Sequence, residues 1–93
     1  MEIRTEDLII CFEGRVVEVF GRKSDFNDRI HADMFGAEAK PHGDGAKVRI
    51  GRVLPGETEL FVGAGRITAT LDAQQWIDFQ ALVAAVKAVK TPQ

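Results

Sequence analysis

The chain has 93 residues, of which 45% are hydrophobic and 28% charged, so it is long enough for one globular domain and too short for a second core. Its 12 basic and 14 acidic residues give a formal net charge of −2. Because this balance lacks the positive field that attracts DNA or RNA, we expect no nucleic-acid partner.

The first seven residues carry Glu2, Glu6 and Asp7 without an apolar core, which is unlike a secretory signal. No run approaches the ~18 apolar residues of a membrane span. Cys11 is the only cysteine, which excludes an internal disulfide and a cysteine-based zinc site; within the apolar run Leu8–Phe12 we interpret it as a small hydrophobic filler. We therefore predict a cytoplasmic protein with no integral membrane segment, and peripheral lipid contact stays open.

Two strands joined by a tight turn are predicted near the start of the chain. Bulky and β-branched residues favour strands over Leu8–Phe12 and Val16–Phe20, and Gly14 between them suits the reversal. The segment Ile3–Thr5 is a candidate for a further strand. A polar loop follows over Gly21–Asp28.

Alternation of apolar and charged residues then predicts a third strand over 29–35. Its apolar face, which ends at Met34, is expected to face the core. One Pro and two Gly within residues 40–45 predict a turn. After it, residues 46–50 alternate again and predict the next strand.

The segment before the C-terminal region is predicted as two more strands with turns. Pro55 and Gly56 fit the centre of a type II turn, and residues 59–62 follow as a strand. Residues 63–65 read as a hairpin turn, and residues 66–71 as the last strand. We thus expect six to seven strands within residues 3–71.

Residues 72–90 contain neither Gly nor Pro, and their apolar positions recur at spacings of three and four. Asp72 is placed to cap a helix, and Gln75 completes the pattern of a capping box. We predict a helix over residues 73–90 whose apolar stripe packs on the strands. The stripe consists of Trp76, Phe79, Leu82, Val83, Val86 and Val89.

Together these elements predict one α+β domain over residues 1–93. Its six to seven short antiparallel strands form an open barrel or a two-sheet sandwich, closed by one C-terminal amphipathic helix. The strand over 66–71, the capping residue Asp72 and the helix anchors Trp76, Phe79, Val83 and Val86 carry a resemblance to pleckstrin-homology-like domains, in particular small bacterial members.

The resemblance implies a non-catalytic module that binds a protein segment, a lipid headgroup or its own copy. Phosphoinositide-binding members carry several basic residues around the first hairpin loop, whereas this loop has one base, Arg15, and one acid, Glu13. This difference argues against a phosphoinositide site. His31 and His42 show no metal-binding or nucleophile-type spacing, so we expect no enzyme activity, no metal and no cofactor.

Three groups of residues are candidates for an interaction surface. Around the polar loop, four basic residues form either a basic patch or a mixed charged surface: Arg15, Arg22, Lys23 and Arg29. His31 follows them on the polar face of the predicted strand. Phe26 in that loop either covers the open end of the barrel or stays exposed as an anchor for a partner. On the helix, the side away from the stripe carries the alanines, which either favour the helix or form an assembly surface: Ala81, Ala84, Ala85 and Ala88.

We predict a binding module for protein–protein interaction or self-association, with a homodimer among the alternatives. Its surface would be an edge strand, over 29–35 or 46–50, open to strand addition, or the alanine face of the helix. The alternative function is binding of a small ligand or a lipid headgroup at the open end of the barrel, near Phe20 and Phe26.

Overall fold

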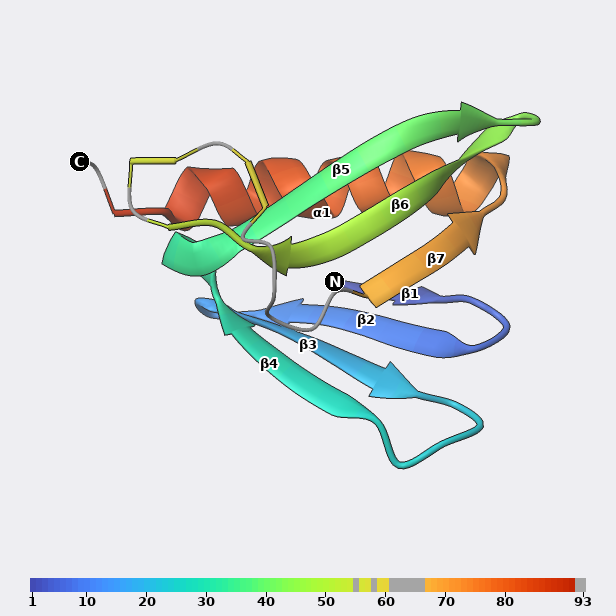
Figure 1. Ribbon diagram of the computed structural model, residues 1–93, viewed down its shortest axis with the longest axis horizontal. Coiled ribbons are helices and arrows are strands. Elements are labelled where there is room, and N and C mark those ends of the chain that lie inside the picture. The colour runs from blue at the N-terminus through green and yellow to red at the C-terminus, as the bar shows by residue number, and fades with distance from the viewer. Residues whose placement is uncertain (55, 58, 61–66, 92–93) are drawn as a thin grey trace.

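The computed structural model describes residues 1–54, 56–57, 59–60 and 67–91. In these residues seven antiparallel strands form two sheets, and one helix follows the last strand (Figure 1). The first sheet has the order β1-β2-β3-β4, the second β5-β6-β7, and the two do not close into a barrel. The elements are β1 (Glu2–Arg4), β2 (Leu8–Glu13), β3 (Val16–Gly21), β4 (Asn27–His31), β5 (Phe35–His42), β6 (Gly45–Arg52), β7 (Ile67–Leu71) and α1 (Ala73–Val89).

Two hairpins use the same turn geometry. Gly14 joins β2 to β3 and Gly43 joins β5 to β6, each with φ of +59° at the first central position of a two-residue turn. The second central residues, Arg15 and Asp44, do not have positive φ. This combination is typical of the type II′ turn, which requires glycine at its first central position and matches the twist of the paired strands.

The predicted strand over 29–35 is wrong in its second half. β4 ends at His31, a 3₁₀ turn, η1, spans Ala32–Met34, and β5 begins at Phe35. The chain passes here from the first sheet to the second. The N–H of Asp33 bonds to Nδ1 of His31 at 3.1 Å and so stabilises the break. Met34 therefore does not face the core and is 39% exposed.

β5 is an additional strand that the residue pattern did not predict. It pairs with β6 from Phe35 opposite Arg52 to His42 opposite Gly45, so the predicted turn over 40–45 is confined to its last residues. Its Gly, Ala and Pro residues are weak strand formers, and pairing with β6 supplies the stability that they lack.

Only some of the predictions for the region after β6 can be compared with the structure. Gly56 has φ of +82°, as the predicted turn requires, but Pro55 lies outside the described residues. Glu59 and Leu60 are not in a strand. Residues 61–62 of that predicted strand, the turn over 63–65 and residue 66 lie outside the described residues.

The capping box at the start of α1 is confirmed. Oδ1 of Asp72 accepts the N–H of Gln75, and Oε1 of Gln75 accepts the N–H of Asp72, both at 2.8 Å. The predicted apolar stripe faces the sheets: Phe79, Leu82 and Val86 are buried, while Trp76, Val83 and Val89 are half-buried.

Trp76 is thus not the central anchor of the helix. It stacks on Phe79 with ring centroids 6.3 Å apart, and Phe79 is the fully buried member of the pair. The core that this stripe completes contains inward residues from all seven strands and from η1: Ile3, Ile10, Phe12, Val17, Val19, Ile30, Ala32, Phe35, Ala46, Val48, Ile50, Ile67 and Leu71.

The C-terminal end of the helix is tied to both sheets. Arg15 in the β2–β3 turn donates to the carbonyl oxygen of Val89 at 2.5 Å. Asp33 accepts from the N–H and the hydroxyl of Thr91 at 2.7 and 2.9 Å, and these bonds lower the pKa of the Asp33 carboxyl. No helix in the described residues has the length and apolar character needed to cross a membrane.

Candidate functional site

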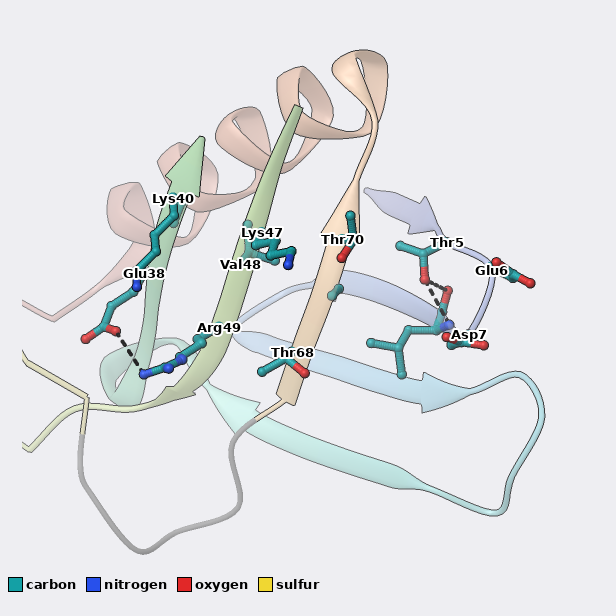
Figure 2. A pocket seen from close by; sticks show the side chains of 13 residues that line it. Thr5, Glu6, Asp7, Glu38, Lys40, Lys47, Val48, Arg49, Thr68 and Thr70 are labelled. Atoms are coloured by element: carbon teal, nitrogen blue, oxygen red, sulfur yellow. Dashed lines mark hydrogen bonds and ion pairs between the residues drawn. The ribbon is translucent and has the colours of Figure 1, made fainter. Parts of the chain in front are cut away.

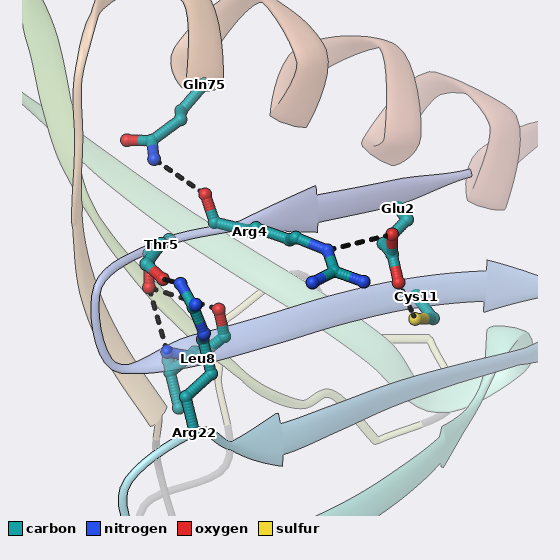
Figure 3. Close-up of polar contacts among 7 residues, drawn as sticks. All are labelled: Glu2, Arg4, Thr5, Leu8, Cys11, Arg22 and Gln75. Atoms are coloured by element: carbon teal, nitrogen blue, oxygen red, sulfur yellow. Dashed lines mark hydrogen bonds and ion pairs between the residues drawn. The ribbon is translucent and has the colours of Figure 1, made fainter.

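The two basic residues of the β3–β4 loop are held in separate local contacts. Arg22 donates to the carbonyl oxygen of Thr5 at 2.6 Å (Figure 3). Nζ of Lys23 lies 3.2 Å from Glu6 and 3.4 Å from Asp7, which raises the pKa of the Lys23 ammonium. Both cations therefore contact the β1–β2 loop, Arg22 at a main-chain carbonyl oxygen and Lys23 at two exposed carboxylates.

Arg29 and His31 on β4 are likewise engaged with neighbouring acids. Nε of Arg29 lies 3.7 Å from Glu18 on β3, and His31 caps η1 next to Asp33. Arg15, the remaining basic residue of the predicted patch, donates to the carbonyl oxygen of Val89. The structure therefore does not bring these residues together as a basic patch; it distributes them over a mixed charged surface.

Phe26 is 43% exposed and does not belong to the core cluster. Its carbonyl oxygen accepts the N–H of Gly21 at 2.7 Å, which closes the β3–β4 loop. On the helix, Ala81, Ala84 and Ala88 are exposed as predicted, but Ala85 is half-buried and packs against the core. Ala85 therefore does not belong to the outer face of α1.

Potential metal-ligating side chains are dispersed over the described residues. These residues contain no group of three or more His, Cys, Asp or Glu side chains that could hold a metal ion. Burial and the nearby Glu2 carboxylate, whose Oε1 lies 3.7 Å from Sγ, raise the pKa of the Cys11 thiol. A raised pKa keeps the thiol protonated and less nucleophilic. Cys11 is half-buried opposite Glu2 and does not belong to the core cluster, so its predicted role as a hydrophobic filler stays a prediction.

The outer strands of the two sheets differ in whether side chains bond to their outward main-chain groups. In the first sheet, Nε2 of Gln75 donates to the carbonyl oxygen of Arg4 on β1 at 2.7 Å (Figure 3). On the opposite edge, Arg52 donates to the carbonyl oxygen of Arg29 on β4 at 3.0 Å. On each outer strand of this sheet, one outward carbonyl oxygen is therefore occupied by a side-chain donor.

Arg52 is itself fixed in place by Asp28. Its two terminal nitrogens lie 3.1 and 2.9 Å from the two oxygens of Asp28, a bidentate pair in a partly buried setting. These hydrogen bonds lower the pKa of the Asp28 carboxyl, and such charge-assisted pairs are stronger than neutral hydrogen bonds.

In the second sheet the edges differ from the prediction. The segment 46–50 lies in β6, which is the middle strand, so it cannot accept another strand. The outer strands are β5 and β7. β7 borders a hollow of about 630 Å³, across which the β1–β2 loop stands with Thr5 to Leu8 (Figure 2).

The orientation of the β5 main chain follows from its hydrogen bonds. The N–H of Val53 donates to the carbonyl oxygen of Met34 at 2.8 Å, and His42 pairs with Gly45 across the two-residue turn. In an antiparallel pair the groups of alternate residues point to the same side. The even-numbered residues of β5 therefore bond to β6, and the odd-numbered residues point outward.

Of these outward groups, those in the middle of β5 lack a partner within the described residues. The carbonyl oxygen of Phe35 accepts from Nζ of Lys90 at 2.9 Å, and Pro41 has no N–H to offer. The N–H and C=O groups of Ala37 and Ala39 remain for another chain. All residues from Glu38 to His42 are exposed, and the β5–β6 hairpin extends away from the first sheet to its tip (Figure 1).

The side chains beside this edge are charged and lie on the outer face of the sheet (Figure 2). Glu38 stands opposite Arg49, with an Oε2 to Nη1 distance of 4.0 Å. Lys40 stands opposite Lys47, and no ion pair in the described part of the chain includes either lysine. Like charges at directly opposite positions are unfavourable, so this pair would gain from an added acidic group.

No protein-family model, curated protein or solved structure matches this chain significantly. The site is therefore defined by its own geometry: the outer edge of β5 with Glu38 and Lys40.

Proposed function

We propose that the protein is a non-catalytic interaction module with a pleckstrin-homology-like fold, and that it binds an extended protein segment as an extra strand on β5. The fold proposal is supported by four strands, three strands and a C-terminal helix in that order. The observation that carries the function is that the outward main-chain groups of Ala37 and Ala39 on this outer strand have no partner within the described residues.

Strand addition obtains affinity from main-chain hydrogen bonds and specificity from alternate side chains. On β5 the alternate side chains next to the partner are Glu38 and Lys40, which face outward together. An antiparallel partner satisfies both charges when it carries Glu opposite Lys40 and Lys opposite Glu38. Read in its own direction, the partner then has the pattern Glu-x-Lys.

Two capped peptides of identical composition test this function: Thr-Val-Glu-Val-Lys-Val-Thr, which has the complementary pattern, and Thr-Val-Lys-Val-Glu-Val-Thr, which reverses it. We expect the first peptide at millimolar concentration to shift the amide resonances of Ala37 and Ala39 and to slow their hydrogen exchange. The reversed peptide should bind more weakly. If neither peptide perturbs these two amides in samples dilute enough for the protein to be monomeric, strand addition on β5 is wrong.

A matched pair of variants locates the binding. Ala39→Pro removes an outward N–H without removing a bond to β6, and Pro41 shows that β5 accepts proline at an odd-numbered position. We expect this variant to fold and to lose the peptide effect. Ala81→Pro would break the helix and is unsuitable, so Ala81→Ser on the exposed helix face serves as the control and should bind like the wild type.

The second candidate is a small anionic ligand in the hollow beside β7, and the observation that favours it is the opposed pair Lys40 and Lys47. A thermal-shift titration with inorganic phosphate and pyrophosphate tests it. A ligand at 100 times its dissociation constant stabilises the fold by about 2.7 kcal/mol. No shift in the wild type, or the same shift in Lys47→Gln, would exclude this site.

A further inference from the structure

We propose that the strand added to β5 is β5 of a second copy of this chain, in an antiparallel pair whose two-fold axis passes beside Ala39. This inference rests on the proposed function, since it names the partner of that edge. The pair would join the two three-stranded sheets into one continuous sheet, with the same patch used on both copies, as two-fold symmetry requires.

The main chain of β5 fits this arrangement. With Ala39 opposite Ala39 of the second copy, the outward N–H and C=O groups of these two residues form a hydrogen-bonded pair. Ala37 then stands opposite Pro41, and its N–H can donate to the outward carbonyl oxygen of Pro41. The missing N–H of Pro41 ends the pairing there, so the register has a defined length.

The side chains select this register. Centring on Ala39 places Glu38 opposite Lys40 of the other copy, and the symmetry repeats the contact. These are positions without main-chain bonds between the two copies, where opposed side chains lie closer together. A shift by two residues in either direction would lose both contacts and would place Glu38 opposite Glu38, or Lys40 opposite Lys40, of the other copy.

The same contacts offset the repulsion between Lys40 and Lys47 within each copy. Lys40 lies opposite Lys47 in its own sheet, and the partner's acidic side chain at position 38 would stand on its other side. Beneath the sheet, the residues that meet are small, Ala37, Ala39 and Pro41, and Ala39 is exposed. Charge and shape are therefore self-complementary along this segment.

Sedimentation equilibrium over micromolar to millimolar concentration tests the inference with five samples. We expect the wild type to form dimers. In Glu38→Lys and in Lys40→Glu we expect the dissociation constant of the dimer to rise about tenfold or more, because two attractive contacts become repulsive. An equimolar mixture of the two variants places two basic residues opposite two acidic ones and should restore a dimer. The double variant Glu38→Lys/Lys40→Glu should again form dimers like the wild type.

Circular dichroism melts of each variant show whether it is folded, and both positions are exposed. A wild type that stays monomeric at millimolar concentration overturns the inference, as does a dimer that the single variants leave unchanged. The peptide experiment separates the two proposals: peptide binding to a strictly monomeric protein refutes self-pairing and keeps strand addition, whereas the absence of both refutes both.

Discussion

The outer strands of the first sheet and the outer half of β5 differ in whether side chains bond to their outward main-chain groups. Gln75 covers β1 and Arg52 covers β4, whereas the groups of Ala37 and Ala39 on β5 have no donor or acceptor within the described residues. An unpaired strand edge is a template for another chain. The difference indicates that the middle of β5 is more open to strand addition than the points on β1 and β4 where a side chain already bonds to an outward carbonyl oxygen.

The covering donors come from distant parts of the chain. Gln75 reaches Arg4 across 71 positions, and Lys90 reaches Phe35 across 55. Both belong to α1 or to its C-terminal end, so these two contacts depend on the helix being docked, whereas Arg52, which contacts β4, lies on β6. The outward groups of Ala37 and Ala39 lie beyond the Lys90 contact, on the part of β5 that pairs with β6. Substitutions that act on the helix should therefore change the contacts at Arg4 and Phe35 first.

The largest effect should follow from Phe79→Ala, which removes the buried anchor of α1. We expect the free energy of unfolding to fall by about 3–5 kcal/mol, the usual range for a buried aromatic residue. Urea denaturation followed by circular dichroism measures the loss. Ile77→Ala, at a position 58% exposed on the same helix, is the control and should change stability little; equal losses for both variants would show that the stripe does not dock the helix.

The next largest effect should follow from Arg52→Met, which uncovers β4 and leaves Asp28 without its partner. Hydrogen bonds to charged groups contribute about 1.5–3 kcal/mol, so we expect a loss of stability on that order. Arg49→Met on the same strand removes only a 4.0 Å contact between exposed side chains and should cost about 0.5 kcal/mol or less. If the two variants lose the same stability, the cover over β4 does not contribute.

Acid should weaken the contact between Asp28 and Arg52 in the wild type. The folded pKa of Asp28 lies below its unfolded value because Arg52 bonds to the carboxylate, so its contribution is fully present above an unfolded pKa of about 3.9. It is lost as the pH falls through the lower folded pKa. We expect the stability difference between the wild type and Asp28→Asn to shrink below about pH 4. A difference that stays constant down to unfolding would mean that the pair does not stabilise the fold.

The sequence predicted the covered side of the molecule better than the open side. The capping box, the inward stripe and the hairpin at Gly14 are local patterns, and the structure confirms them. β5 was not predicted because its Gly, Ala and Pro residues are weak strand formers. Its pairing with β6 is decided by tertiary contacts. The break at η1 was hidden because Ala32 and Met34 kept the alternation of a strand.

The candidate site was missed for the same reason. Edge strands were expected to carry it, but which strand is an edge depends on the order of strands in each sheet, and no spacing in the chain states that order. Once β5 is placed at an edge, the alternation Glu38-Ala39-Lys40 becomes informative, because it puts opposite charges on one face at the distance that a symmetric partner requires.

The smallest effect concerns the cover over β1. Gln75→Ala removes both the return bond of the capping box and the bond to the carbonyl oxygen of Arg4, and we expect a loss of about 1 kcal/mol, as for other capping residues. Gln74→Ala removes one exposed contact to Asp78 and should cost a few tenths of a kcal/mol. Hydrogen exchange sharpens the comparison, because loss of the cover should speed exchange in β1 and leave β5 unchanged. If Gln75→Ala behaves like Gln74→Ala, the carbonyl of Arg4 is satisfied equally well by water, and the contrast between covered and open edges then rests on β4 alone.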